Sequence, residues 1–218
     1  VQTCALPIST QAQYGLLGVT NLTAATTSLL NSVVDSKTSA TVDSVPELQA
    51  LADAAAAVAT GAAGGTAPTL AQLQALGITG VTADNLAAVQ AAIAATADHA
   101  SGVDTLTELQ SVASTATAAF TAALNAISTA AQGDTATGTS PAVSDYTAAG
   151  VTGVTAGNLA AIDSALNTAA VNGAAVDTAA EVQALVNAYN AVLAAADNTS
   201  DGDVGATQAQ YGLLGVTG

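Results

Sequence analysis

Residues 146–155 read Tyr-Thr-Ala-Ala-Gly-Val-Thr-Gly-Val-Thr, and this stretch decides the fold because variants of it recur along the chain. The other copies begin at Tyr14, Leu73 and Tyr211. Residues 10–20 and 207–217 are identical and read TQAQYGLLGVT. Internal similarity of this kind is the signature of a repeat architecture. The sequence therefore predicts a row of like units.

A second motif follows each of the first three copies, at residues 42–49, 103–110 and 176–183. The joint glycine precedes the motif glutamate by 29 residues in the first unit (47 − 18) and by 31 in the others (108 − 77, 181 − 150). A Ser or Thr three residues before Glu is a capping box, which predicts the start of a helix. The predicted boxes are Ser44 with Glu47, Thr105 with Glu108, and Thr178 with Glu181.

The Gly-Val-Thr-Gly-Val-Thr motif is predicted to join two helices. Its first glycine suits the left-handed residue that ends a helix, and the next residue supplies an apolar contact. Its second glycine can also take a positive φ, and Asn21, which replaces it once, is among the few residues that tolerate this. The joint glycines are Gly18, Gly77, Gly80, Gly150, Gly153 and Gly215, and the threonines expected to cap the next helix are Thr23, Thr82 and Thr155.

Apolar residues recur at helical spacing between these motifs, and no segment reads as a strand. We therefore predict an all-α fold of tandem small three-helix bundles, arranged as separate beads because the linkers are polar and contain glycine. A helical solenoid whose neighbours share cores is the alternative. The predicted repeats 1 to 3 are 9–66, 67–139 and 140–204, a fourth starts at 205–218, and the expected linkers are 61–66, 133–140 and 198–206.

The charge balance excludes two classes of partner. The chain of 218 residues has one Lys or Arg against 16 Asp or Glu, a formal net charge of −15. Binding to nucleic acid or to an anionic membrane needs several basic residues, so we expect neither. No uninterrupted apolar run approaches the length of a membrane span, so we expect no membrane insertion. Self-repulsion through the acidic excess suits a protein outside the cell.

Residues 1–8, Val-Gln-Thr-Cys-Ala-Leu-Pro-Ile, are what the common sequencing adapter GTTCAGACGTGTGCTCTTCCGATC encodes. We interpret them as an artefact and exclude them from the fold prediction. The only cysteine, Cys4, goes with them, which leaves no disulfide or thiol chemistry to expect. Without this segment the chain reads as an internal piece of a longer protein.

Few residues are candidates for chemistry, and we predict no catalytic residue and no cofactor. His99 and Lys37 read as helix-end residues, because a single His cannot make a metal site unaided. The three box glutamates lie in different repeats, and capping already explains them. The remaining candidate is a weak calcium site at Asp197, Thr199, Asp201 and Asp203, whose oxygens alternate as in the first half of a calcium loop, but the closing acid is missing.

Residues 77–88, 150–161 and 178–186 resemble the helical repeats of very large bacterial surface proteins, the biofilm-associated and RTX-type adhesins. The resemblance covers nearly all of the chain after Ile8. It implies a secreted structural extender on the bacterial cell surface, between an anchored end and a distal binding end, whose partners are neighbouring repeats of the same chain. These residues do not identify the adhesion target.

Two other functions stay open at this stage. A three-helix module could bind a protein or a glycan, which would need an exposed apolar or aromatic patch, and the recurring Tyr14, Tyr146 and Tyr211 are the candidates. We expect these tyrosines instead to pack over the joint. An Ala/Thr-rich helix could bind ice through Thr115, Thr117 and Thr121, although their spacing is irregular.

Overall fold

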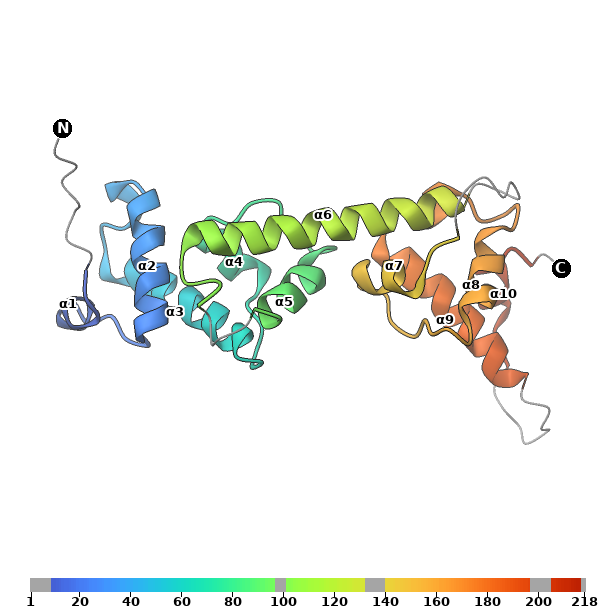
Figure 1. The fold of residues 1–218 in the computed structure, drawn as a ribbon, viewed down its shortest axis with the longest axis horizontal. Coiled ribbons are helices and arrows are strands. Elements are labelled where there is room, and N and C mark those ends of the chain that lie inside the picture. Colours follow the sequence, from blue (N-terminus) through green and yellow to red (C-terminus); the bar gives the residue numbers. More distant parts are fainter. Residues whose placement is uncertain (1–8, 97–100, 132–139, 197–204, 217–218) are drawn as a thin grey trace. The chain divides into compact units, whose positions relative to one another are not determined.

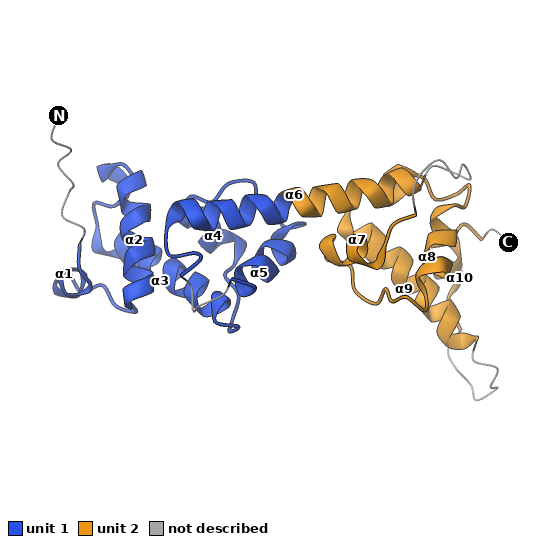
Figure 2. Cartoon of the chain, in the orientation of Figure 1, with its two compact units in different colours: residues 1–117 blue, residues 118–218 orange. Residues whose placement is uncertain are grey.

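The computed structural model describes residues 9–96, 101–131, 140–196 and 205–216. Every regular element in these residues is a helix, so the all-α prediction is confirmed (Figure 1). The chain divides into two compact units, residues 1–117 and 118–218 (Figure 2). The boundary falls inside the longest helix, α6 (Leu106–Ala130), which supplies residues to both units.

Unit 1 contains the helices of the first two predicted repeats. They are α1 (Gln11–Leu16), α2 (Ala24–Ser36), the 3-10 turn η1 (Ser39–Thr41), α3 (Val45–Ala62), α4 (Leu70–Leu76), α5 (Leu86–Ala94) and the first half of α6. Unit 2 contains the second half of α6, α7 (Val143–Ala148), α8 (Leu159–Leu166), the 3-10 turn η2 (Gly173–Ala175), α9 (Ala179–Ala195) and α10 (Gln208–Leu213). Each repeat thus has a short helix, a joint, a second helix and a longer third helix.

Helix α6 shows how the sequence builds a long element from small residues. It has no Gly or Pro over 25 residues, so nothing in its sequence interrupts the helical hydrogen bonds. Its buried side chains recur every three or four residues, which keeps them on one side of the helix. They are Leu109, Ala113, Ala116, Phe120, Ala123 and Ile127, followed by Ala131 just beyond the helix.

One hydrophobic core runs through both repeats of unit 1, with buried side chains from Tyr14 to Ala116. Helix α3 belongs to repeat 1 by sequence, yet it packs against both α4 and α5 of repeat 2. The expectation of separate beads is therefore not met in unit 1, where the neighbours share a core as in a solenoid. Alanine explains the sharing, because the small Ala52, Ala54 and Ala55 let neighbouring helices approach α3 closely.

The linker expected at residues 61–66 also differs from the structure. Gly61 and Ala62 are the last residues of α3, and both are buried. A Cβ on Gly61 would lie 2.8 Å from Cδ of Pro68, so this glycine permits a close contact between α3 and the segment that leads into α4. A glycine in a helical pattern marked tight packing here, and the sequence reading mistook it for a flexible break.

Unit 2 has its own core, which runs from Ala123 in α6 to Leu214 after α10. Its largest fully buried side chains include Tyr146, Ile162 and Leu166. Helix α9 packs against both α8 and α10. The first helix of the predicted fourth repeat is therefore part of the packing of unit 2.

Candidate functional site: the repeated joint

The second motif starts the third helix of each repeat. Ser44 and Thr178 are the N-caps of α3 and α9, and Thr105 immediately precedes α6. The backbone N–H of each cap residue donates to the Glu carboxylate, over 3.0 Å to Glu47, 3.2 Å to Glu108 and 3.1 Å to Glu181. The cap hydroxyls also donate to these carboxylates at 2.8–2.9 Å. The same two bonds from cap residue to glutamate thus begin all three helices.

These hydrogen bonds set the charge state of the boxes. Donation from the cap hydroxyl holds the pKa of Glu47, Glu108 and Glu181 below its usual range, since the bonds favour the ionised form. In repeats 2 and 3 the pKa of the aspartate before the cap is shifted in the opposite direction. Burial raises the pKa of Asp104, and the hydrogen bond with Glu181 raises the pKa of Asp177. The capping bonds therefore favour the ionised form of each box glutamate.

The first motif forms a joint whose glycines have left-handed backbones. The first glycine of each copy has φ of 88°, 96°, 74° and 79°, at Gly18, Gly77, Gly150 and Gly215. The second glycine, Gly80 or Gly153, also has a positive φ of 81° or 82°. Asn21 occupies this second position in repeat 1 with φ of 63°. The chain therefore turns in the same way at each joint.

The helix after the joint begins in two ways. Thr23 is the N-cap of α2. In repeats 2 and 3 the helix starts three residues later than expected, after Asn85 and Asn158, because an extra turn comes first. Thr82 N–H donates to Oδ1 of Asn85 at 2.8 Å, and Asn85 Nδ2 donates to the carbonyl of Gly80 at 2.9 Å. The asparagine side chain thus ties the joint to the new helix.

A glutamine in the second motif holds the joint, and sequence reasoning gave it no role. Oε1 of Gln110 accepts from the backbone N–H of Thr79 at 2.9 Å, while its Nε2 donates to the Thr79 carbonyl at 3.2 Å. Gln183 makes the same two bonds to Thr152, at 2.8 and 3.1 Å. The side-chain amide pairs with the threonine backbone as a neighbouring strand would. We call this pair of bonds the glutamine clamp.

Repeat 1 has the same clamp, between Gln49 and Thr20, at 2.9 and 3.4 Å. Each clamp spans 29 or 31 residues of sequence, which is the nearly constant separation of the two motifs. That constancy was the signal in the sequence. It meant that the two motifs touch, and the glutamine is the residue through which they do so.

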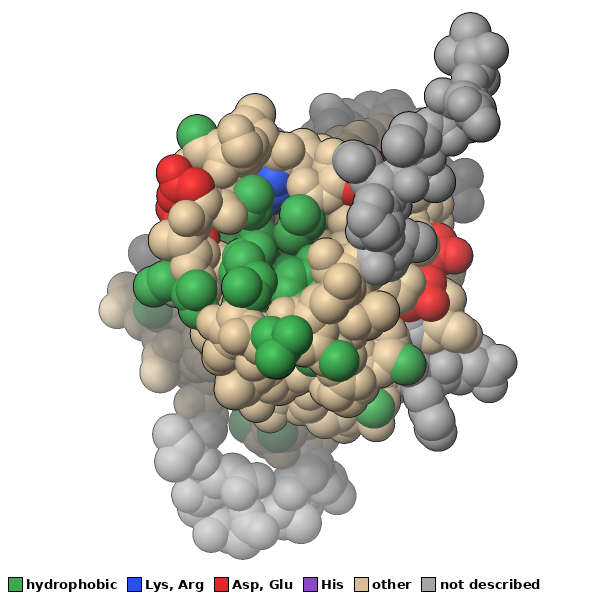
Figure 3. Space-filling model, turned by 90° about the vertical axis from the view of Figure 1, so that its left-hand side faces the viewer, with side chains coloured by type: hydrophobic (Ala, Val, Ile, Leu, Met, Phe, Trp, Pro, Cys, Tyr) green, Lys and Arg blue, Asp and Glu red, His purple; other side chains and the backbone are tan. Residues whose placement is uncertain are grey.

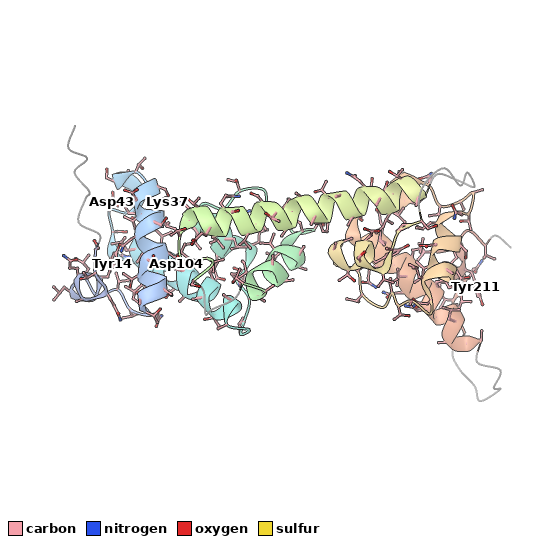
Figure 4. All side chains as sticks on the ribbon, in the orientation of Figure 1. Tyr14, Lys37, Asp43, Asp104 and Tyr211 are labelled. Atoms are coloured by element: carbon pink, nitrogen blue, oxygen red, sulfur yellow. The ribbon has the colours of Figure 1, made fainter. Side chains whose placement is uncertain are left out.

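The recurring tyrosine anchors the first helix to the second. Tyr14 Oη donates to Oδ1 of Asn31 at 2.9 Å, and Tyr146 Oη donates to Oδ1 of Asp163 at 2.8 Å. Tyr14 is 4% exposed and Tyr146 is 0% exposed, so neither offers an aromatic binding surface. Burial raises the pKa of both tyrosines and also that of Asp163. Tyr211 on α10 is 38% exposed (Figure 4).

The other candidates lie apart from the joints or outside the described residues. Lys37, labelled in Figure 4, follows α2, and its Nζ donates at 3.0 Å to the carbonyl of Ala75 in the last turn of α4. A cation at that place complements the helix dipole. Thr115 and Thr121 are exposed on α6, and Thr117 is half-buried. His99 and the calcium candidates Asp197, Thr199, Asp201 and Asp203 lie outside the described residues.

The described residues hold neither a cluster of metal-ligand side chains nor a helix suited to a membrane. They contain no group of three or more His, Cys, Asp or Glu side chains that could hold a metal ion. No helix among them combines the length and the hydropathy that a membrane crossing requires. The joint with its clamp and its cap is therefore the arrangement in these residues that recurs with fixed geometry. No family model, curated protein or solved structure matches the chain.

Proposed function

We propose that this chain is a non-catalytic extender, a stalk segment of small helical repeats in a large secreted bacterial surface adhesin. The observation that carries the proposal is the threefold recurrence of one connection: a capped third helix whose glutamine clamps the joint of the same repeat. Repetition of a connection with constant geometry favours a mechanical role, because each added unit continues the array in the same way.

The packing of unit 1 supports this role. The two repeats there share a core, and Lys37 of repeat 1 bonds to α4 of repeat 2. A repeat that shares its core with a neighbour resists bending at the junction, whereas beads on flexible linkers would not. The formal charge of −15 supports a crowded exterior location, since like-charged stalks repel one another.

The proposal is tested by lengthening the array with its own repeat sequence. Because residues 10–20 and 207–217 are identical, residue 206 of one copy can be joined to residue 10 of a second copy with the repeat sequence unbroken. An extender should then nearly double its radius of gyration in small-angle X-ray scattering. A chain that packs into one globule would show a rise of only about 1.3-fold, from the scaling of compact proteins with length. The smaller rise would refute the extender function.

A further inference from the structure

Four apolar positions are buried in repeats 2 and 3 but not in repeat 1. In repeat 1 they are Leu17, Val34, Val42 and Leu48, which we call the N-terminal face. Leu17 is 54% exposed, and the other three are half-buried at the edge of the core. The equivalents in repeat 2 are Leu76, Ile93, Val103 and Leu109, and those in repeat 3 are Ala149, Leu166, Val176 and Val182. All eight equivalents are at most 1% exposed.

The structure shows what lies against the equivalent positions in repeat 2. Helix α3, the last helix of repeat 1, packs on α4 and α5. Two polar bonds accompany the packing: Lys37 Nζ to the Ala75 carbonyl at 3.0 Å, and the backbone N–H of Leu106 to Oγ of Ser32 at 3.0 Å. The last helix of the preceding repeat therefore packs on the helices that carry Leu76 and Ile93, and all four positions share one core with it.

Repeat 3 is covered in the same way, from within unit 2. Ala123, Ile127 and Ala131 of the α6 segment share one hydrophobic core with the four positions of repeat 3. Helix α6 is the last helix of repeat 2, so it corresponds to α3. Ser128 on this segment also donates from Oγ to the carbonyl of Gly173, at 3.0 Å. Two independent junctions thus use the same helix of the repeat on the same side of the next one.

The start of repeat 4 gives a third instance. Leu214, the equivalent of Leu17, is 6% exposed and belongs to the core of unit 2, where α10 packs on α9. A Cβ on Gly215 would lie 2.7 Å from Oγ1 of Thr168, so this joint approaches repeat 3 closely. The same Cβ on Gly18 would meet nothing within 4 Å. The last helix of repeat 3 therefore already receives the first helix of the next repeat.

The N-terminal face of repeat 1 has no such cover among the described residues. Figure 3 looks at this end of unit 1 and shows hydrophobic side chains gathered on it. Val45, the first residue of α3, is also exposed, at 43%. An exposed apolar group of this kind marks an interaction site.

We propose that the N-terminal face is the docking surface for the last, alanine-rich helix of another repeat of this same kind, equivalent to α3, α6 or α9. The inference deepens the extender function, on which it rests, by naming the surface through which one repeat receives the repeat before it. The covering helices carry small buried residues, such as Ala52 and Ala55 on α3 and Ala123 on α6, beside the larger Ile127 on α6. Small side chains admit the close approach that full burial of the four positions requires.

The test is thiol protection in the seamless tandem of two copies, with Cys4 replaced by Ser throughout. Val42→Cys is placed in the second copy only, where the last helix of the first copy would cover it, and is compared with Val42→Cys in the single chain. We expect the second-copy thiol to react with a maleimide at least tenfold more slowly, because its equivalents Val103 and Val176 are 1% and 0% exposed. Leu48→Cys gives a second reporter in case Val42→Cys disturbs folding.

Ala12→Cys is the matched control, because Ala12 and its equivalents Ala71, Ser144 and Ala209 are all exposed. Its thiol should react equally fast in the single chain and in the second copy. Equal rates for Val42→Cys and Leu48→Cys in the two proteins would overturn the docking surface. They would leave the extender function standing if the radius of gyration still grew in proportion to length, so the two failures are distinguishable.

Discussion

Helices α1 and α10 have the same sequence and bury opposite sides of it. In α1 and its joint, Tyr14 and Val19 are each 4% exposed, whereas Leu17 is 54% exposed. In α10 and its joint the pattern is reversed. Tyr211 is 38% exposed, Val216 is 56% exposed, and Leu214 is only 6% exposed.

The difference separates the two tasks of one short helix. The tyrosine and the valine of α1 pack into their own repeat, which α2 and α3 complete. The leucine packs onto the preceding repeat. For α10 that repeat is present, and its last helix is α9. Since the sequence is the same, burial here is decided by the neighbours and not by the local residues. One side of the first helix completes its own repeat, and the other side joins it to the repeat before.

The largest expected effect is the difference in free energy of unfolding between replacing a covered leucine and replacing an uncovered one. Leu76→Ala removes a side chain that is 0% exposed beneath α3, so it should lower the free energy of unfolding by about 2–4 kcal/mol. Leu17→Ala removes the equivalent side chain where it is 54% exposed and should cost less than about 0.5 kcal/mol. Urea unfolding followed by circular dichroism measures both. Equal costs would show that the two leucines have the same environment.

The joint glycines allow a second comparison of the two ends. Gly18→Ala places a side chain at φ of 88° in open space, so it should cost about 1–2 kcal/mol through backbone strain alone. Gly215→Ala adds a clash with Thr168 to the same strain and should release α10 from unit 2. Hydrogen exchange of residues 208–214 should then rise at least tenfold. Unchanged protection of α10 would contradict the close approach at Gly215.

The glutamine clamp should contribute a smaller amount. Gln49→Ala removes two hydrogen bonds to the backbone of Thr20, which at exposed positions should cost about 1 kcal/mol. The specific readout is the Thr20 amide, whose exchange should become faster because it loses its acceptor. Gln74→Ala, which changes an exposed glutamine of α4 in the same unit, is the control and should leave the Thr20 amide unchanged. If the Thr20 amide stayed protected in Gln49→Ala, the clamp would not be what holds the joint.

Local signals in the sequence predicted the helices and most of their ends, because their causes are local. A glycine with positive φ and a Ser/Thr-x-x-Glu box act within four residues, so Gly18 and Ser44 could be interpreted without any partner. The clamp could not be derived in this way, since Gln49 and Thr20 meet only after the chain has turned back. Their nearly constant separation was visible in the sequence, but it did not identify the atoms that make the contact.

Shared cores were the alternative that the sequence left open, and separate beads were the prediction. The glycines and polar residues of 61–66 were interpreted as a flexible linker, whereas Gly61 is a buried residue of α3 against Pro68. The choice between flexible linker and tight packing depends on what lies opposite the glycine. For the same reason the identical residues of α1 and α10 could not reveal which of their sides is covered.

The smallest expected effect concerns the partner of the recurring tyrosine, which is Asn31 in repeat 1 and Asp163 in repeat 3. Asn31 accepts from Tyr14 and also donates from Nδ2 to the carbonyl of Ser9 at 2.8 Å. An ionised carboxylate cannot donate, and burial raises the pKa of Asp163. Asp163→Asn should therefore stabilise unit 2 at pH 7, by no more than about 1 kcal/mol, while keeping an acceptor for Tyr146.

The sign of the pH dependence tests this explanation. A carboxyl whose pKa is raised on folding binds its proton more tightly in the folded state, so its stabilising contribution is complete below the ordinary pKa of 3.8 and falls as pH rises through the raised value. The advantage of Asp163→Asn should therefore shrink as pH falls towards 3.8. The box carboxylate of Glu181, whose pKa is lowered, weakens both proteins alike in acid and cancels in the difference. A difference that stays constant from pH 8 to pH 4 would mean that the charge of Asp163 is not what distinguishes the two tyrosine anchors.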